Sequence, residues 1–578
     1  DTTAVGYNAL RDNTSGTANT ALGDSCLYAN TTGSSNTAVG HESLMAATTA
    51  DSNTAVGYNA SRLSTIGNNN VALGYQALYT NVAGDRNVAL GWRSLYVMTR
   101  STTADTYNVG CGNETLYSCT TGASNTAIGG KALYNNTTAD NNTAVGYEAL
   151  YSNTTGTINT ALGRQALRAN TTGTDNTAVG YSLTSNTTGD NNTAVGRGAL
   201  NVNTTANNNT GLGYAALTAN TTGTENTAVG KGALDANTTA DENTAVGSNS
   251  LTANTTGINN TGLGYGALSA NTTANYNTSV GSHSLQDNTT GASNSALGYK
   301  ALGDNTTGSY NTAVGKNALT ANTTGQENVA IGWNSLDANT TATANTACGA
   351  SALGGTTTGA DNTAVGYQAL VTNTTGSNNT AVGREALEAC TTGGENTAFG
   401  KAALHALTTG SDNTTVGIAA GLFVTSGSNN LLLGHDAGRP DSPSGNVGTS
   451  SHQVCLGNNS ITNAFIKVAF TVTSDERDKI EDGVVSHGLS FVNQLKPKSF
   501  WFRKNRESDK KTGDKRYGFY AQDILALEGS DNVVIDNKDS DNLKFKGDQL
   551  IPILVNAIQE LSTEITALKT KVTALESA

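Results

Sequence analysis

The chain has 578 residues, a formal net charge of −13 and 13% charged residues, which is about half the usual share of a globular protein. Ala, Val and Leu recur at fixed intervals, and this register excludes a disordered chain rich in charge and proline. An acidic, lysine-poor chain also lacks the basic footprint of a nucleic-acid-binding protein, and no run reaches the roughly 18 apolar residues of a membrane span.

Residues 1–434 consist of 26 near-identical blocks with the consensus N-T-A-V-G-Y-x-A-L-x-x-N-T-T-G-x-x. Asn opens 25 of them, from Asn19 to Asn430, and 23 of the 25 steps between block starts share one 17-residue length. Every block has Gly four residues after its start. A repeat this strict indicates a one-dimensional array of stacked units, so we expect a rod and not a catalytic globule.

One block, Asn142–Ile158, shows what a unit of this length can build. Thr143–Val145 and Ala149–Leu150 are short apolar segments that read as strands, and Asn153–Gly156 reads as a turn. The block is too short for a helical repeat. The sequence therefore predicts an all-β solenoid, a β-helix or β-roll with 17-residue coils, about 125 Å long at the usual strand spacing.

The predicted core of each coil is thin. Val145 and Leu150 are the only regular large apolar positions, and each contributes roughly 1.5–3 kcal/mol when fully buried. Ordering the backbone costs on the order of 1–2 kcal/mol per residue. We therefore expect several chains to share a core, with the Val or the Leu column facing a symmetry axis. Copies of Asn142 and Asn153 are expected to form side-chain ladders along the rod.

Two block steps depart from the common length. The step from Asn87 to Asn108 has four extra residues, and the step from Asn176 to Asn192 lacks one. We expect the extra residues to form an exposed loop near residues 97–106, in which Met98 and Arg100 are either neutral or a local contact point.

The six cysteines form no C-x-x-C pair, so they are interpreted as small buried side chains in preference to disulfides or metal ligands. Cys111 and Cys348 stand at the Val position of their blocks. No metal site and no cofactor are expected.

The composition changes after residue 434. The last 144 residues hold 18 of the 32 Lys and Arg residues and all four prolines. We place a domain boundary there: residues 1–434 form the shaft, residues 435–473 a linker with terminal strands, and residues 474–578 a further domain. Within the linker, His452–Gly457 and Ala464–Val472 are predicted as strands.

The chain ends in a predicted coiled coil over residues 550–577. Apolar residues alternate by steps of three and four along this segment, which is the a/d pattern of a heptad repeat. They are Ile551, Leu554, Ile558, Leu561, Ile565, Leu568, Val572 and Leu575. Ile at a with Leu at d favours two strands in model systems, so this pattern alone does not indicate three chains.

Three motifs precede this helix: S-D-E-R-D-K at Ser474–Lys479, G-L-S-F-V-N-Q-L-K-P-K-S-F at Gly488–Phe500, and G-F-Y-A-Q-D-I at Gly518–Ile524. Together, over residues 474–578, they resemble the C-terminal intramolecular chaperone domain of phage tail fibres and endosialidases, the peptidase S74 family. The resemblance implies a small α+β domain that trimerises, helps the preceding β-fibre to wind and then cuts the chain. It implies Ser474 as nucleophile, Lys479 as its base and Thr473–Ser474 as the scissile bond.

The residues allow this chemistry, because a serine hydroxyl becomes nucleophilic when a base takes its proton, and Ser-Lys pairs are a known variant. Two other interpretations stay open. The hexapeptide could be a charged turn or a helix start with Ser474 as N-cap. Asp475 and Asp478 could also keep Lys479 protonated, which would silence it as a base. Any activity would be a single-turnover self-cleavage without an external substrate.

The repeat T-A-V-G-Y-x-A-L resembles the A-I-G-x-x-A-x-A head repeat of trimeric autotransporter adhesins of the YadA type. That resemblance implies left-handed β-rolls around a trimer axis. The hexapeptide left-handed β-helix, whose coil is one residue longer, is a near alternative.

These features predict a structural and adhesive homotrimeric fibre protein, a viral tail or capsid fibre at the virion surface or otherwise extracellular. Its expected partners are its own copies, a host surface receptor that could be a glycan, and a virion attachment protein. Because the chain opens inside a block, the attachment region is expected to precede it. The alternatives are a cellular trimeric surface adhesin and, less favoured, an ice- or glycan-binding fibre. An enzyme acting on glycans is disfavoured, because the blocks carry acidic residues only sporadically.

Overall fold

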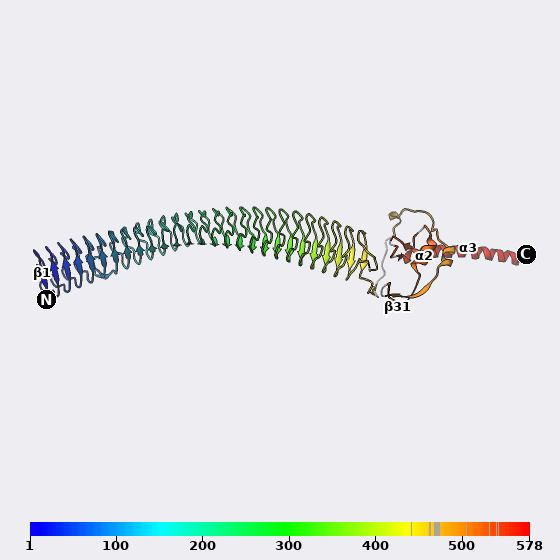
Figure 1. The fold of residues 1–578 in the computed structure, drawn as a ribbon, viewed down its shortest axis with the longest axis horizontal. Helices are drawn as coiled ribbons and strands as arrows, with labels where there is room; N and C mark the ends of the chain where they lie inside the picture. The colour runs from blue at the N-terminus through cyan, green and yellow to red at the C-terminus, as the bar shows by residue number, and fades with distance from the viewer. Residues whose placement is uncertain are drawn as a thin grey trace. The chain divides into compact units, whose positions relative to one another are not determined.

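The computed structural model describes residues 1–440, 442–461, 464–467, 474–503, 506–530, 532–538, 540–541 and 543–577. The chain forms two compact units, Asp1–Asn378 and Asn379–Ala578. The first unit is a parallel β-solenoid, seen as stacked arrows in Figure 1. The second unit contains further solenoid coils and a small α+β part. The predicted solenoid with 17-residue coils is confirmed.

Each coil contributes one three-residue strand that starts directly after the block's first residue and ends before its Gly. In the first unit these strands are β1 (Thr3–Val5), β2 (Thr20–Leu22), β3 (Thr37–Val39), β4 (Thr54–Val56), β5 (Val71–Leu73), β7 (Val88–Leu90), β9 (Val109–Cys111), β10 (Thr126–Ile128), β11 (Thr143–Val145), β12 (Thr160–Leu162), β13 (Thr177–Val179), β14 (Thr193–Val195), β15 (Thr210–Leu212), β16 (Thr227–Val229), β17 (Thr244–Val246), β18 (Thr261–Leu263), β19 (Thr278–Val280), β20 (Ser295–Leu297), β21 (Thr312–Val314), β22 (Val329–Ile331), β23 (Thr346–Cys348) and β24 (Thr363–Val365). In the second unit they are β25 (Thr380–Val382), β26 (Thr397–Phe399), β27 (Thr414–Val416), β28 (Leu431–Leu433) and β29 (Val454–Leu456).

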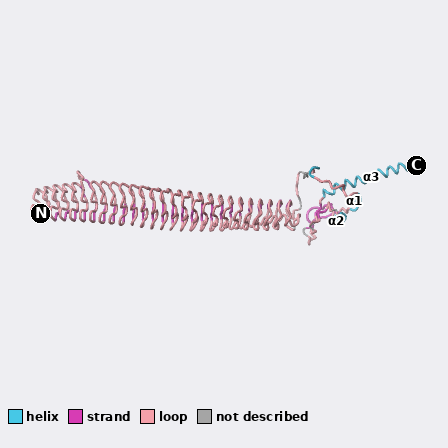
Figure 2. Tube along the Cα trace, turned by 90° about the horizontal axis from the view of Figure 1, so that it is seen from above, coloured by secondary structure: helices cyan, strands magenta, loops and turns pink. Residues whose placement is uncertain are grey.

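Neighbouring strands pair in parallel with equivalent residues side by side. Between β11 and β12, for example, Thr143 pairs with Thr160, and Val145 with Leu162. The strands, magenta in Figure 2, form one wall of each coil, and turns form the rest. Identical residues thus stack in columns along the solenoid, at about 4.8 Å per coil.

The second apolar segment of the block is a turn, so the prediction of a strand at Ala149–Leu150 is wrong. Leu150 has φ +52°, in the left-handed region that non-glycine residues seldom adopt, and Glu148 has φ +55°. The Leu150 amide still donates to the Ala166 carbonyl of the next coil at 3.0 Å. Two positive-φ residues in one segment turn the chain through the corner that so short a coil requires, and stacking contacts hold them there.

The core lies inside each single coil. Ala144, Ala149 and Leu150 are fully buried, whereas Val145 is only half-buried on the outer face of the strand. In the single chain the Val column is therefore not buried, whereas the Leu column is buried inside its own coil and does not face a symmetry axis. The reason is the two-residue alternation of a strand, which turns Thr143 and Val145 outward when Ala144 points inward.

The predicted asparagine ladders are present, and they satisfy the peptide groups of the turns. The backbone N–H and the side-chain Nδ2 of Asn159 both donate to Oδ1 of Asn142 in the preceding coil, at 2.9 and 3.1 Å. Asn159 Nδ2 also donates to the Gly173 carbonyl at 2.9 Å. In a second ladder, Asn170 Nδ2 donates to Asn153 Oδ1 at 2.9 Å. All these Asn side chains are fully buried.

Asn159→Leu is expected to destabilise the solenoid by at least about 2 kcal/mol, because it leaves several buried polar groups without partners. The matched change Asn170→Leu should cost less, since the second ladder already contains buried Met98 and Cys119 in place of Asn. Denaturant unfolding followed by circular dichroism measures both. Equal losses for the two variants would contradict this distinction between the ladders.

The four-residue insertion does not expose Met98, so that expectation is wrong. Met98 occupies the block position that Asn81 occupies in the preceding coil. Side chains at this position point inward, in the second ladder, and Met98 is therefore fully buried. The Arg100 guanidinium donates to the Thr121 carbonyl. Residues 101–103 are exposed and form no strand, as expected of a loop, and β8 (Ala104–Asp105) pairs in parallel with β6 (Gly84–Asp85).

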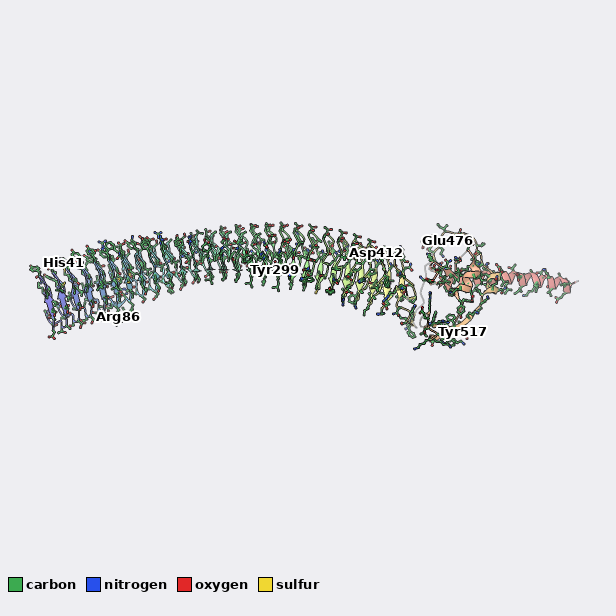
Figure 3. All side chains as sticks on the ribbon, viewed as in Figure 1. His41, Arg86, Tyr299, Asp412, Glu476 and Tyr517 are labelled. Atoms are coloured by element: carbon green, nitrogen blue, oxygen red, sulfur yellow. The ribbon has the colours of Figure 1, made fainter. Side chains whose placement is uncertain are left out.

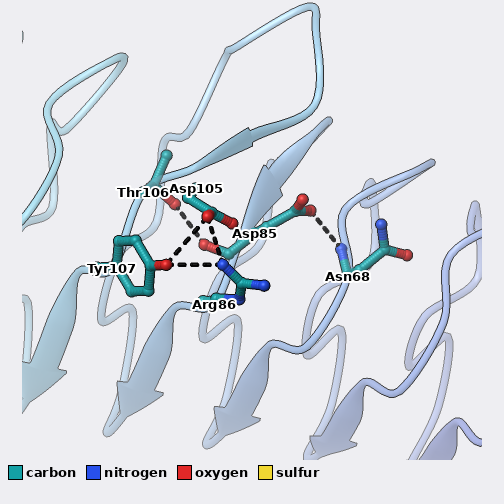
Figure 4. Close-up of polar contacts among 6 residues, drawn as sticks. All are labelled: Asn68, Asp85, Arg86, Asp105, Thr106 and Tyr107. Carbon is teal, nitrogen blue, oxygen red and sulfur yellow. Dashed lines mark hydrogen bonds and ion pairs between the residues drawn. The ribbon is translucent and has the colours of Figure 1, made fainter.

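An ion pair between Arg86 and Asp105 links the β6 and β8 segments (Figure 4). The Arg86 guanidinium contacts the Asp105 carboxylate and donates to the Tyr107 hydroxyl at 2.7 Å. The Tyr107 hydroxyl in turn donates to Asp105 at 3.0 Å. The insertion is therefore an ordered local addition to the coil.

The remainder of the second unit is a small α+β part. It comprises two single-turn helices, η1 (Glu476–Asp478) and η2 (Gly547–Gln549), the helices α1 (Leu489–Gln494), α2 (Ala521–Glu528) and α3 (Leu550–Glu576), and the strands β30 (Lys498–Arg503), β31 (Lys511–Gly518), β32 (Ile535–Asp536) and β33 (Lys544–Phe545). β30 pairs antiparallel with β31, and β32 with β33. The predicted helix over residues 550–577 is confirmed as α3.

The two strands predicted in the linker have different outcomes. β29 (Val454–Leu456) lies within the predicted segment His452–Gly457. Of the segment Ala464–Val472, residues 464–467 form no strand, and residues 468–472 lie outside the described residues.

Candidate functional site

Ser474 and Lys479 lie on either side of the single turn η1, and the turn brings their side chains together. Asp475 caps the turn by accepting from the Arg477 amide at 2.9 Å, and the Lys479 amide donates to the Glu476 carbonyl at 3.0 Å. This geometry folds the chain back over a short span, so that Lys479 Nζ donates to Ser474 Oγ. Asp475, and not Ser474, is the N-cap.

The neighbouring acidic residues do not engage the lysine. The Asp475 carboxylate is held by the Arg477 guanidinium at 2.6 Å, and this hydrogen bond lowers the pKa of Asp475. Among the residues that the structure describes, no carboxylate forms an ion pair with Lys479 Nζ. The Asp475 carboxylate thus pairs with Arg477, and the side chain of Lys479 contacts Ser474 instead.

The site is open to solvent in the single chain. Ser474, Glu476 and Lys479 are all exposed, and Glu476 lies at the periphery of this part of the unit (Figure 3). A lysine acts as a base only after losing its proton, which burial promotes by disfavouring the charged form. The arrangement therefore places a serine hydroxyl and a lysine amine in contact, and both residues are exposed. Thr473, the other residue of the expected scissile bond, lies outside the described residues.

A small hydrophobic core supports the chain after this site. It consists of Phe491, Ile524, Val534, Ile535, Leu550 and Ile553. Glu528 is buried beside this core, and its carboxylate accepts hydrogen bonds from the backbone amides of Val534 and Ile535. The motifs Gly488–Phe500 and Gly518–Ile524 thus contribute α1 and the start of α2 to one core.

The first turns of α3 are anchored to this core. Leu550 and Ile553 belong to this core, and Ala557, one turn further along α3, is also buried. The α1 end is tied to α3 as well, since the Leu489 amide donates to Glu560 Oε2 at 2.7 Å and Asn556 Nδ2 donates to the His487 carbonyl at 3.0 Å. The helix therefore has one face committed to its own domain.

A second apolar face of α3 has no cover in the single chain. All eight residues of the heptad seam are between 38% and 77% exposed. They are Ile551, Leu554, Ile558, Leu561, Ile565, Leu568, Val572 and Leu575. An exposed apolar stripe along a whole helix is typical of a surface that packs against other helices.

The cysteines are all free thiols, and their positions partly correct the sequence interpretation. Cys119 and Cys390 are buried, and burial raises the pKa of the Cys119 thiol to about 12 and that of Cys390 to about 11. Both thiols are therefore protonated and unreactive at neutral pH. Cys348 is exposed and Cys111 half-exposed, contrary to expectation, because the Val position of the block faces outward.

Sequence reasoning overlooked one group of possible metal ligands. Glu385, Glu388 and His405 have ligand atoms within 4.8 Å of one another, and His405 Nε2 lies 2.6 Å from Glu388 Oε2. The signal was present in the repeat, because Glu388 and His405 occupy equivalent positions of successive blocks and stack in one column. The His405–Glu388 ion pair also accounts for this proximity without a metal.

Within the described residues, no helix has the length and apolar character needed to cross a bilayer. Comparisons with protein-family models, curated proteins and solved structures give no match for this chain.

Proposed function

We propose that this chain is the shaft and assembly domain of a homotrimeric attachment fibre at a virion surface. The observation that carries the proposal is the exposed heptad seam of α3, on a helix whose adjoining face is already anchored to its own domain. Such a seam associates chains of the same kind. The three-chain state follows from the resemblance of residues 474–578 to S74-type assembly domains.

A shaft of identical coils needs such an assembly domain. Because most strands share a T-A-V or closely similar pattern, a slip of one coil between neighbouring chains changes few contacts. Association through α3 would align the chains at one end, and winding could proceed from there coil by coil. The half-exposed column of Val145 and its copies supplies an apolar face along which the shafts could pack.

Self-cleavage would follow assembly. Burial of the turn η1 between chains would favour neutral Lys479, which could then take the proton of the Ser474 hydroxyl. Ser474 Oγ would add to the Thr473 carbonyl carbon, the Thr473–Ser474 amide bond would break with its nitrogen taking a proton, and water would hydrolyse the resulting ester. Release of the assembly domain would leave a fibre that is stable for kinetic reasons.

A cellular trimeric adhesin is the second candidate, since a solenoid shaft would serve it equally. An ice-binding role is less favoured, because the Thr154 hydroxyl donates to the Thr171 carbonyl at 3.0 Å, and its copies do the same in neighbouring coils. Those hydroxyl groups are engaged by the backbone of the next coil and do not form a free ordered array.

Light scattering of the purified full-length chain tests the assembly. We expect particles of three copies of the 58.8 kDa chain, or of its shaft fragment after cleavage, and rods in electron micrographs. A monomer at neutral pH would overturn the proposal. An antibody raised against the shaft should label virions if the fibre is viral, and should label cells if the adhesin alternative holds.

A further inference from the structure

One column of the solenoid combines aromatic and cationic side chains. We call it the corner column: the residue that directly follows the block's first Gly, at the corner after each strand. Over six successive coils it alternates strictly between the two kinds of side chain. The six residues are Tyr147, Arg164, Tyr181, Arg197, Tyr214 and Lys231.

The parallel register fixes the spacing of these side chains. Strands β11 to β16 pair in register, so successive corner residues are about 4.8 Å apart and successive cations about 10 Å apart. The three tyrosines are 43–55% exposed, and the three cations are exposed as well. The column continues to Tyr299, labelled in Figure 3, but there it loses the strict alternation.

The step from Asn176 to Asn192, which lacks one residue, falls in the middle of this run. The residue after Tyr181 is absent, and the equivalent position of the next coil is Gly198, which has no side chain. A surface depression lies at this coil, lined by Gly163, Arg164, Gly180, Tyr181 and Arg197. Two arginines and one tyrosine of the corner column thus line one depression.

The cations of this run, Arg164, Arg197 and Lys231, form no ion pair with any carboxylate among the described residues. Several arginines elsewhere on the solenoid are paired, as Arg168 is with Glu148 at 2.8 Å and Arg62 with Glu42 at 2.6 Å. Three cations in one column that lack such partners form a local positive stripe on an acidic chain with net charge −13. A stripe of this kind is available to an anionic ligand.

We propose that the corner column binds a linear acidic polysaccharide lying along the shaft, with Arg164, Tyr181 and Arg197 as its centre. Guanidinium groups bind carboxylate and sulfate through paired hydrogen bonds, and exposed tyrosine rings offer apolar surfaces to sugar rings. The coil spacing is close to the advance of an extended glycan per sugar. A glycan with an anionic group on alternate sugars therefore matches cations on alternate coils. This proposal rests on the attachment role and names the receptor class.

The test uses the assembled full-length protein and isothermal calorimetry with three probes: a hyaluronan decasaccharide, a heparin decasaccharide and a neutral maltodextrin of the same length. We expect at least one acidic probe to bind, the neutral probe not to bind, and the double variant Arg164→Gln/Arg197→Gln to lose at least tenfold in affinity. The double variant Arg62→Gln/Arg168→Gln removes the same charge from paired sites and should bind within twofold of the wild type.

Inserting Asn after Tyr181 restores a 17-residue step and adds a side chain next to Tyr181 without changing the charge, so it should also weaken binding at least tenfold. Absence of binding to both acidic probes, equal losses in the two double variants, or equally tight binding of a single-stranded DNA of matched length would overturn the inference. Light scattering on each sample keeps the two proposals separate. A trimer that fails to bind overturns only this one, whereas a monomer overturns the assembly proposal.

Discussion

Aspartate in place of both Leu561 and Ile565 is expected to leave the full-length chain monomeric. Both side chains lie in the exposed seam of α3, away from the buried face formed by Leu550, Ile553 and Ala557. Burying an unpaired carboxylate in a helix interface costs at least about 2 kcal/mol, and several copies would meet in one assembly. We therefore expect association to weaken by more than about 10³-fold, measured by sedimentation equilibrium.

A matched control separates assembly from folding. Thr563 and Thr570 lie on α3 on the side opposite the seam, where both hydroxyls donate only to carbonyls of their own helix. Thr563→Asp/Thr570→Asp introduces the same two charges and should still assemble. If the seam variant remained fully assembled, or if the control dissociated equally, the seam could not be the site of association.

Ser474→Ala is expected to leave the chain at full length, whereas the assembled wild type should yield fragments 1–473 and 474–578. Without Oγ there is no nucleophile to form the ester, so the rate should fall on the order of 10⁴-fold or more. Lys479→Met should have a similar effect, because it removes the base that contacts Ser474. Intact-mass spectrometry of the assembled protein measures both.

Ser460→Ala, at an exposed serine ahead of the turn, serves as the control and should be cut like the wild type. Cleavage that persisted in Ser474→Ala would rule out this serine as the nucleophile. A wild-type chain that assembled into trimers but stayed intact would show that the site is silent, and the assembly proposal would stand.

The repeat predicted most of the solenoid because identical residues at a fixed step must occupy identical environments. Coil length, strand position and both asparagine ladders follow from that rule, and so does the stacking of Glu388 on His405. The repeat alone does not predict whether the side chain at each block position points inward or outward. Leu150 adopts a left-handed φ that its residue type disfavours, and Met98 is buried where an inserted loop was expected.

The sequence also predicted part of the candidate site at Ser474 and Lys479. The close spacing of Ser474 and Lys479 in the chain suggested a pair, and the turn η1 does bring them into contact. The engagement of Asp475 by Arg477 was not predictable, because it depends on which of several nearby charges the turn places within reach. The depression beside Tyr181 was not predictable either, because it depends on how Arg164, Tyr181 and Arg197 of three successive coils are placed around it.

The 17-residue period and the heptad pattern of residues 551–575 can be read directly from residue order, because periodicity is a property of that order. Which columns are buried depends on the folded coil, because the closure of each coil sets whether a side chain points inward or outward. In the single chain, Leu150 and the Asn ladders point inward, Val145 is half-buried, and the corner column and the seam of α3 are exposed.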